Sequence, residues 1–274
     1  MKTRRQVLGQ NFLRHRPTIE KITQLVDAEL SHAVHRPKAL LEIGPGGLAL
    51  TKPLQELASA RGLPLVLVER DPRLEDPIRA GATDAEIHFM DAATEKLGAL
   101  FLDLQARGHA PLFVASNLPY SAGSRILANL CHLSGMGMVS GAVVMVQKEV
   151  AERMAAPAAS RDRGAFSLLI QCYFEPRIEF DVGPGAFHPP PKVTSTVLAL
   201  RPLSKPKTAG LADPLKFEDF CKRLFSQRRK MIRGFVPRDA HAQFGRLGLN
   251  GTERPETLEL DTVLELFRVC GKQS

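Results

Sequence analysis

Residues 39–51 read ALLEIGPGGLALT, an apolar run that leads directly into a glycine-rich turn and a helix-compatible segment. The run ALLEI (39–43) has the continuous hydrophobicity of a strand that is buried on both faces of a sheet. Glycines at the end of such a strand, here Gly44 and Gly46, let the backbone turn tightly and approach a ligand. The stretch therefore predicts the start of a nucleotide-binding α/β fold, although such a turn could also be purely structural.

Further apolar runs extend this pattern along the chain. They are PLVLVE (64–69), EIHFM (86–90), PLFVAS (111–116) and AVVMVQ (142–147). Helices are expected over Pro17–Val26, 49–60 and 124–133, and strands that alternate with helices predict a mostly parallel, doubly wound sheet. LLIQCYFEPRIEF (168–180) and STVLALRPL (195–203) could add an antiparallel pair, whereas GQNFL (9–13) is interpreted as a loop.

The 274 residues are enough for two domains. PLSKPKTAGLADP (202–214) is polar and contains Pro and Gly, as linkers do, so we expect domains over 1–203 and 204–274. Apolar residues beyond the linker have helical spacing, which predicts a small helical second domain. They are Phe217, Phe220, Cys221, Leu224, Phe225, Leu258, Val263, Leu264, Leu266 and Phe267.

The composition, 44% hydrophobic and 24% charged, is that of an ordinary globular protein and excludes disorder, collagen and coiled coil. A net charge of +8 makes a polyanion such as nucleic acid a reasonable partner, although it also fits simple solubility. The cysteines and histidines lack metal-ligand spacing, and the basic start of the chain is not followed by an apolar segment. We expect a monomeric cytoplasmic protein with no metal and no membrane contact.

Acidic residues end the second and third predicted strands. Glu69 in VERD (68–71) comes about 20–25 residues after the glycines, where this fold holds ribose hydroxyls, and NAD and S-adenosylmethionine both carry such a ribose. Asp91 in MDA (90–92) could accept a hydrogen bond from an adenine amino group, or it could be only a helix cap or a loop residue.

The fourth strand leads into Asn117-Leu118-Pro119-Tyr120. The exocyclic amine of a nucleobase is a poor nucleophile, because its lone pair is delocalised into the ring. The Asn117 amide oxygen and a main-chain carbonyl fixed by Pro119 could hold its two hydrogens and draw the nitrogen toward tetrahedral geometry. Tyr120 offers a face on which an extruded base can stack. The segment favours base methylation over its alternative, a turn in which Asn117 caps the next helix.

In these segments the chain resembles the ribosomal RNA adenine dimethyltransferases of the KsgA type. The resemblance implies a Rossmann-like class I methyltransferase fold with a small C-terminal helical domain. It implies S-adenosylmethionine-dependent N6,N6-dimethylation of two adjacent adenosines near the 3' end of 16S rRNA, with a role in small-subunit biogenesis. Residues 1–203 would be catalytic and 204–274 would bind RNA. The matching segments also include MVQKEVAERM (145–154), FHPPPKVTSTV (187–197) and FSQRRKMIR (225–233).

The resemblance implies three sets of site residues. The residues expected to bind the donor are Asn11, Leu13, Gly44, Gly46, Glu69, Asp91, Ala92 and Asn117. Those expected to act on the target amine are Asn117, Leu118, Pro119 and Tyr120. Those expected to contact RNA are Tyr120, Phe187, Arg228, Arg229, Lys230 and Arg233, with the basic run on a helix that could also be a solvated face.

One departure from the family pattern follows Tyr120. Ser121-Ala122-Gly123 stand where many relatives have Asn-Ile-Ser, which could widen the base pocket.

Other functions remain open on the sequence alone. The alternatives are a 23S rRNA adenine-N6 methyltransferase of the macrolide-resistance type, a non-catalytic RNA-binding or assembly factor on the same fold, and an NAD-linked dehydrogenase. FHPPPK (187–192) and FSQRRKMIR favour the small-subunit enzyme.

Overall fold

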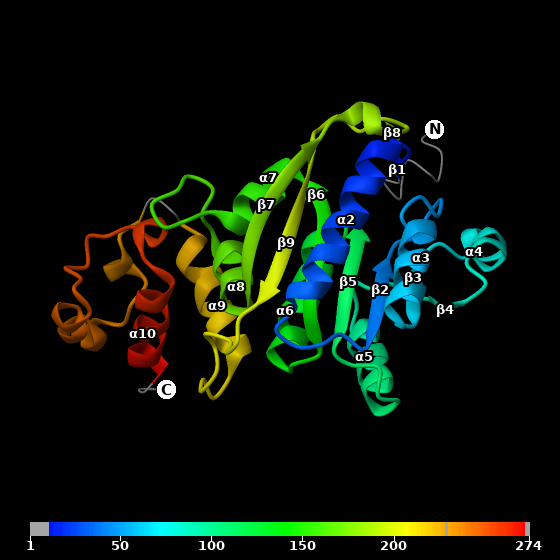
Figure 1. Cartoon of the computed structure of the whole chain (residues 1–274). Coiled ribbons are helices and arrows are strands. Elements are labelled where there is room, and N and C mark those ends of the chain that lie inside the picture. Colours follow the sequence, from blue (N-terminus) through cyan, green and yellow to red (C-terminus); the bar gives the residue numbers. More distant parts are fainter. Residues whose placement is uncertain (1–10, 228–229, 272–274) are drawn as a thin grey trace. The chain divides into compact units, whose positions relative to one another are not determined.

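The structure is a computed structural model that describes residues 11–227 and 230–271 (Figure 1). Contacts divide the chain into two compact units. The first comprises the residues up to Ala151 and Phe174–Ser204, and the second comprises Glu152–Tyr173 and the residues from Lys205 on. The expected domains, 1–203 and 204–274, differ from these units in the segment Glu152–Tyr173 and by one residue at Ser204. This segment clusters with the C-terminal helices because its helix α8 (Ala165–Tyr173) contacts α9 (Pro214–Phe225) and α10 (Leu260–Gly271).

In the described part of the first unit, seven strands form one sheet. Across the sheet they are β4 (Ala85–Phe89), β3 (Leu65–Glu69), β2 (Ala39–Ile43), β5 (Leu112–Asn117), β6 (Val139–Gln147), β9 (Ser195–Pro202) and β7 (Phe174–Val182). The first five strands in this order, from β4 across to β6, are parallel, whereas β9 pairs antiparallel with both β6 and β7. The predicted doubly wound sheet and the antiparallel addition are therefore confirmed.

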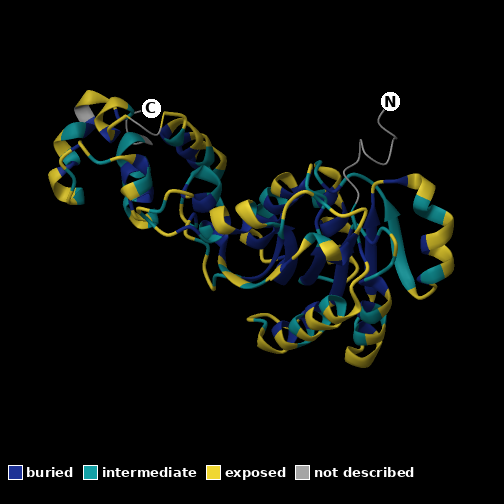
Figure 2. Cartoon of the chain, turned by 90° about the horizontal axis from the view of Figure 1, so that it is seen from above, coloured by how far each residue is buried: buried dark blue, intermediate teal, exposed yellow. Residues whose placement is uncertain are grey.

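Helices cover both faces of this sheet, with α2 in front and α6 behind it in Figure 1. Their bounds are α2 (Arg16–His32), α3 (Thr51–Arg61), α4 (Glu75–Gly81), α5 (Lys96–Ala106), α6 (Gly123–Gly135) and α7 (Lys148–Ala155). Every residue of β2 and β3 is buried, as their continuous apolar runs predict, and Figure 2 shows the buried residues concentrated on the strands and the inward helix faces.

Two local expectations from the sequence are wrong. The run 168–180 was expected to be a strand, but its first part belongs to α8 and β7 begins only at Phe174. A short apolar run fits a buried helix as well as a buried strand, so the pattern could not separate them. GQNFL was interpreted as a loop, yet Phe12–Leu13 form β1, which pairs antiparallel with β8 (Phe187–His188). That partner is remote in sequence and leaves no local signal.

The second unit is helical, as predicted. Besides α8, α9 and α10 it contains short 3-10 helices at Ile232–Gly234, Arg238–Gln243, Gly245–Leu247 and Pro255–Thr257. The rings of Phe217 and Phe220 lie 5.4 and 5.6 Å from the ring of Phe267. No helix in the described residues has the length and apolar character to cross a membrane.

The basic run after α9 does not continue that helix, which corrects the expectation that it lies on one. α9 ends at Phe225, Lys230 follows in a bend, and Arg233 lies in a 3-10 helix. Arg228 and Arg229 lie outside the described residues. Helical spacing of apolar residues ends with Phe225, and a run of charges carries no periodic signal of its own.

Candidate functional site

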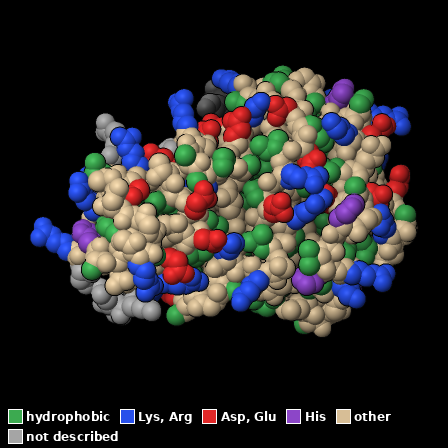
Figure 3. Space-filling view, turned by 60° about the vertical axis from the view of Figure 1, so that its left-hand side comes forward, with side chains coloured by type: hydrophobic (Ala, Val, Ile, Leu, Met, Phe, Trp, Pro, Cys, Tyr) green, Lys and Arg blue, Asp and Glu red, His purple; other side chains and the backbone are tan. Residues whose placement is uncertain are grey.

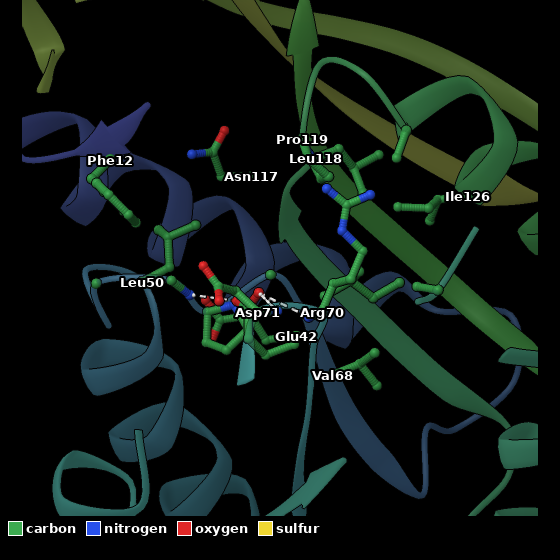
Figure 4. Close-up of a pocket in the computed structure, with 18 of the residues that line it drawn as sticks. Phe12, Glu42, Leu50, Val68, Arg70, Asp71, Asn117, Leu118, Pro119 and Ile126 are labelled. Atoms are coloured by element: carbon green, nitrogen blue, oxygen red, sulfur yellow. Dashed lines mark hydrogen bonds between the residues drawn. The ribbon is translucent and has the colours of Figure 1, made fainter. Parts of the chain in front are cut away.

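A pocket opens at the carboxyl ends of β2, β3, β4 and β5 (Figure 4). The sheet order changes direction between β2 and β5, and open α/β sheets bind ligands at such a switch point. The predicted site residues that line the pocket are Asn11, Leu13, Gly44, Gly46, Glu69, Asp91, Ala92, Asn117, Leu118, Pro119 and Tyr120. The fold thus brings together side chains from five separate segments of the chain.

The glycine-rich turn after β2 forms one wall of the pocket. Gly44 and Gly46 have φ of +76° and +51°, in the left-handed region that favours glycine. A Cβ atom on Gly46 would lie 3.0 Å from Cε1 of Phe12, so the ring packs directly on this turn. Phe12 lines the pocket between the predicted Asn11 and Leu13, and its backbone there pairs with His188 of β8.

The carboxylate of Glu69 joins the end of β3 to the glycine turn. It is 6% exposed and accepts hydrogen bonds from the N–H groups of Gly46 (3.2 Å), Arg70 (2.8 Å) and Asp71 (2.8 Å). A carboxylate has about four acceptor positions, so these three bonds leave capacity for one more donor. A ribose hydroxyl that enters the pocket could fill it.

Asp91 and Arg70 lie together on the wall formed by β3 and β4. Asp91 Oδ1 accepts a hydrogen bond from the N–H of Ala93 (2.9 Å) in the turn before α5, whose N-cap is Glu95, so for this oxygen the loop-residue alternative holds and the helix cap does not. Its Oδ2 lies 3.6 Å from Nη1 of Arg70. Arg70 is the one Lys or Arg among the described lining residues, and in Figure 4 its guanidinium points toward Leu118 and Pro119. Arg70 belongs to the VERD segment, but nothing in that segment distinguishes an arginine that lines a pocket from one that is exposed to solvent.

The segment after β5 turns directly into α6. The carbonyl of Pro119 accepts hydrogen bonds from the N–H groups of Ala122 (3.0 Å) and Gly123 (2.8 Å). Ala122 is the N-cap of α6, with no side-chain capping bond, so the alternative in which Asn117 caps this helix is wrong. Asn117 is half-buried at the pocket, and Leu118, which also lines it, is buried.

Tyr120 lies half-buried at the pocket edge. Its hydroxyl shares a 2.6 Å hydrogen bond with Oγ of Ser195, at the start of β9. Burial raises the pKa of Tyr120, and the bond to Ser195 only partly opposes this, so the phenol is uncharged at neutral pH. Tyr120 therefore presents a neutral aromatic ring and no phenolate base.

Phe187 does not line the pocket, and its predicted role as a second stacking partner is wrong. The side chain is 5% exposed and belongs to the hydrophobic core, where its backbone pairs with Leu13. A ring buried on both faces has no free face for a base. An aromatic residue next to rigid prolines gives the same sequence pattern whether its ring is buried in the core or open to a base, so the sequence could not distinguish the two cases.

The carboxyl of Glu42 lines the pocket and is almost completely buried. Its Oε2 has no hydrogen-bond partner in the described part of the chain. Burial raises the pKa of Glu42 to about 8, and the charge of Glu69 acts in the same direction. The carboxyl is thus mostly protonated at neutral pH. An acidic residue inside the apolar run ALLEI is the signal that could have marked it.

The described residues contain no group of three or more His, Cys, Asp or Glu side chains that could hold a metal ion. The pocket instead offers the glycine-rich turn, the remaining acceptor capacity of Glu69 and the Oδ2 atom of Asp91. Such a set suits a ligand that carries an adenosine.

Sequence comparison matches this chain to one family over nearly its whole length. The model of the family described as ribosomal RNA adenine dimethylase matches residues 1–270. A ribosomal RNA small subunit methyltransferase A from Anaeromyxobacter sp. (strain K) is 37% identical, over 96% of this chain and 92% of its own. The protein of that name from Geobacter metallireducens is 36% identical, over 96% of this chain and 94% of its own.

Two solved structures share the fold. A dimethyladenosine transferase from Plasmodium falciparum has a TM-score of 0.70 at 20% identity and covers 96% of this chain and 98% of its own. The 23S rRNA methyltransferase ErmE has a TM-score of 0.64 at 24% identity and covers 95% of this chain and 100% of its own. At these identities the likeness shows the fold alone, and the predicted class I methyltransferase fold is confirmed.

Replacing Glu42 with Gln should stabilise the protein more at pH 8 than at pH 5. The folded carboxyl keeps its proton up to about pH 8, whereas the unfolded chain loses it near pH 4.5. The free energy of unfolding of the parent protein therefore falls as the pH rises through this window, by at most about 1.4 kcal/mol per pH unit. Thermal unfolding of both proteins across the window measures the difference, and a difference that stays constant with pH would contradict the buried, protonated state.

Proposed function

The chain belongs to the ribosomal RNA adenine dimethylase family, and we propose that it dimethylates N6 of two adjacent adenosines near the 3' end of 16S rRNA. It is an S-adenosylmethionine-dependent methyltransferase, as its family is. The observation that supports the proposed chemistry is one pocket that joins the glycine turn and Glu69 to Asn117 and Tyr120. The specificity for the small subunit is inferred from the names of the relatives at 36–37% identity. The same proposal includes the expected monomeric state, cytoplasmic location and role in subunit biogenesis.

The donor would lie along the carboxyl ends of the parallel strands. Gly44 and Gly46 would contact its methionine end, Glu69 would accept from its ribose, and Oδ2 of Asp91 would accept from its adenine. Adenine would compete with Arg70 for this oxygen, because Asp91 Oδ1 is already used by a backbone N–H. S-adenosylmethionine supplies a methyl group that its sulfonium already activates for direct transfer.

The protein's work at the target base is positioning. The amide oxygen of Asn117 and the carbonyl of Leu118, which Pro119 fixes, would hold the two hydrogens of the adenine amine. The nitrogen lone pair would then face the methyl group that the donor supplies, and the methylated nitrogen would give its proton to water. Tyr120 would hold the base by stacking and takes no part in proton transfer.

The second transfer needs room for the first methyl group. The small side chain of Ala122 lines the pocket beside Tyr120, and Gly123 follows it without a side chain. A monomethylated amine keeps one hydrogen, so one acceptor loses its partner and the new methyl must turn away from the donor. Small residues after Tyr120 support a dimethylated product for this reason.

Substrate RNA would also contact the second unit. Lys230 and Arg233 are exposed, and Arg228 and Arg229 complete the basic run in the sequence. On the face shown in Figure 3, Lys and Arg side chains are spread among acidic side chains and do not gather in one patch. The net charge of the chain therefore does not indicate an RNA-binding surface on that face. The proposal that residues 204–274 bind RNA rests instead on the basic run 228–233.

The proposed reaction predicts which particle accepts the methyl groups. With labelled S-adenosylmethionine, unmodified 30S particles should yield labelled N6,N6-dimethyladenosine, whereas 50S particles should stay unlabelled. Nucleosides are separated by chromatography after digestion, and mass spectrometry maps the modified positions. Labelling of 50S particles would instead support the 23S alternative, and the absence of label from both would support the non-catalytic alternative.

Replacing Asn117 with Ala should lower turnover by about 10²–10³-fold, as loss of one transition-state contact does elsewhere, and leave donor affinity nearly unchanged. Replacing Glu69 with Gln should weaken donor binding by about 10- to 100-fold, because a hydrogen bond to a charged group is lost. Calorimetry with S-adenosylhomocysteine measures the affinity, and 30S methylation measures turnover. Equal losses of affinity in the two variants would contradict this division of roles.

Replacing Arg228, Arg229 and Lys230 with Gln should weaken RNA binding and reduce its log–log salt slope by about one unit for each lost phosphate contact. A matched variant with Lys216, Lys222 and Arg223 of α9 replaced by Gln removes the same charge from exposed positions. Its salt slope should not change. Equal slopes for the two variants would mean that the basic run is only a solvated face.

A further inference from the structure

The hydroxyl groups of Tyr120 and Ser195 share a 2.6 Å hydrogen bond between residues 75 positions apart. Ser195 is completely buried. Its register places it opposite Gln147 of β6 on one side and Val182 of β7 on the other. Because both neighbouring strands hold its backbone, its hydroxyl is a fixed point next to a residue that belongs to a turn.

Tyr120 needs such a fixed point. It lies between β5 and α6, outside any strand or helix, and its side chain is only partly buried. A hydrogen bond at the far end of the ring anchors its long axis, and because a phenol O–H prefers to lie in the ring plane, it also favours one orientation of the ring face. Functional groups must be held to within about 10–20° of the productive geometry, and loops hold them less well than strands do.

We propose that Ser195 is a positioning residue for methyl transfer, which holds the ring of Tyr120 at the angle on which the target adenine stacks. Ser195 acts only through Tyr120 and has no contact with donor or base. The identity of that base rests on the proposed function, whereas the fixing of the ring does not.

The second methyl transfer should depend on this contact more than the first. An unmodified adenine amine can be held by two hydrogen bonds, to Asn117 and to the Leu118 carbonyl. A monomethylated amine retains one hydrogen and can make only one of them. Stacking on Tyr120 then supplies a larger share of the positioning, and a loosened ring should leave monomethyladenosine in the product.

A double-mutant cycle tests whether Ser195 acts through Tyr120. Ser195→Ala and Tyr120→Phe should each slow the second transfer about three- to tenfold, the usual effect of one hydrogen bond. The double variant should be no slower than Tyr120→Phe alone, and donor affinity should not change. Additive effects, or equal slowing of both transfers, would overturn the proposal.

Ser140→Ala is the matched control. Ser140 is also a buried sheet serine, in β6, but its hydroxyl has no hydrogen-bond partner in the described part of the chain. Its truncation should leave both transfers unchanged. Slowing of the second transfer by Ser140→Ala would mean that any buried serine in this sheet has the effect, against a specific role for Ser195.

A spectroscopic measurement separates this proposal from the proposed function. The chain has two tyrosines and no tryptophan, so ring-labelled tyrosine gives an NMR spectrum in which Tyr120→Phe identifies the Tyr120 signals. Ser195→Ala should shift or broaden those signals and leave the Tyr173 signals unchanged. Unchanged Tyr120 signals would refute the positioning role. Altered signals in a protein that labels no 30S particles would refute the substrate assignment alone.

Discussion

The carboxylate of Glu69 is the interaction on which the donor side of the pocket depends. It is buried, and a buried charge is tolerated only where hydrogen bonds replace its water. Its three partners are backbone N–H groups from both the glycine turn and its own strand end. One side chain thereby fixes the spacing between the ends of β2 and β3, so the ligand meets a pocket that is already formed.

The target side of the pocket is supported in a different way. Parallel strands bring the donor contacts to one edge of the sheet, but Tyr120 lies beyond the end of β5, where no parallel neighbour reaches it. The antiparallel strand β9 begins at this place and contributes Ser195. The strands added to the doubly wound core thus have a function beyond covering an edge, since they support the residue on which the base is proposed to stack.

The parts of this molecule that the sequence predicted are those whose signals are local. Apolar runs, a glycine turn and acids at strand ends located the sheet and most of the pocket, because each depends on a few neighbouring residues. The errors at Phe187 and at Phe12–Leu13 have one cause, since these residues pair with each other across the chain. The end of α9 before Lys230 was not predicted, because a run of solvated charged residues has no periodic pattern that would indicate whether it is helical.

Four acidic residues line the pocket, and the charge of each is limited in its own way. Glu69 accepts three backbone N–H groups, Asp71 pairs with Arg73, Asp91 faces Arg70, and burial keeps Glu42 protonated. This matters because the methyl donor is a sulfonium cation whose charge disappears during transfer. Uncompensated carboxylates would stabilise the charged reactant more than the transition state, and only stronger binding of the transition state accelerates a reaction. A pocket rich in acids but poor in free negative charge can therefore hold the donor by hydrogen bonds without opposing the loss of its charge.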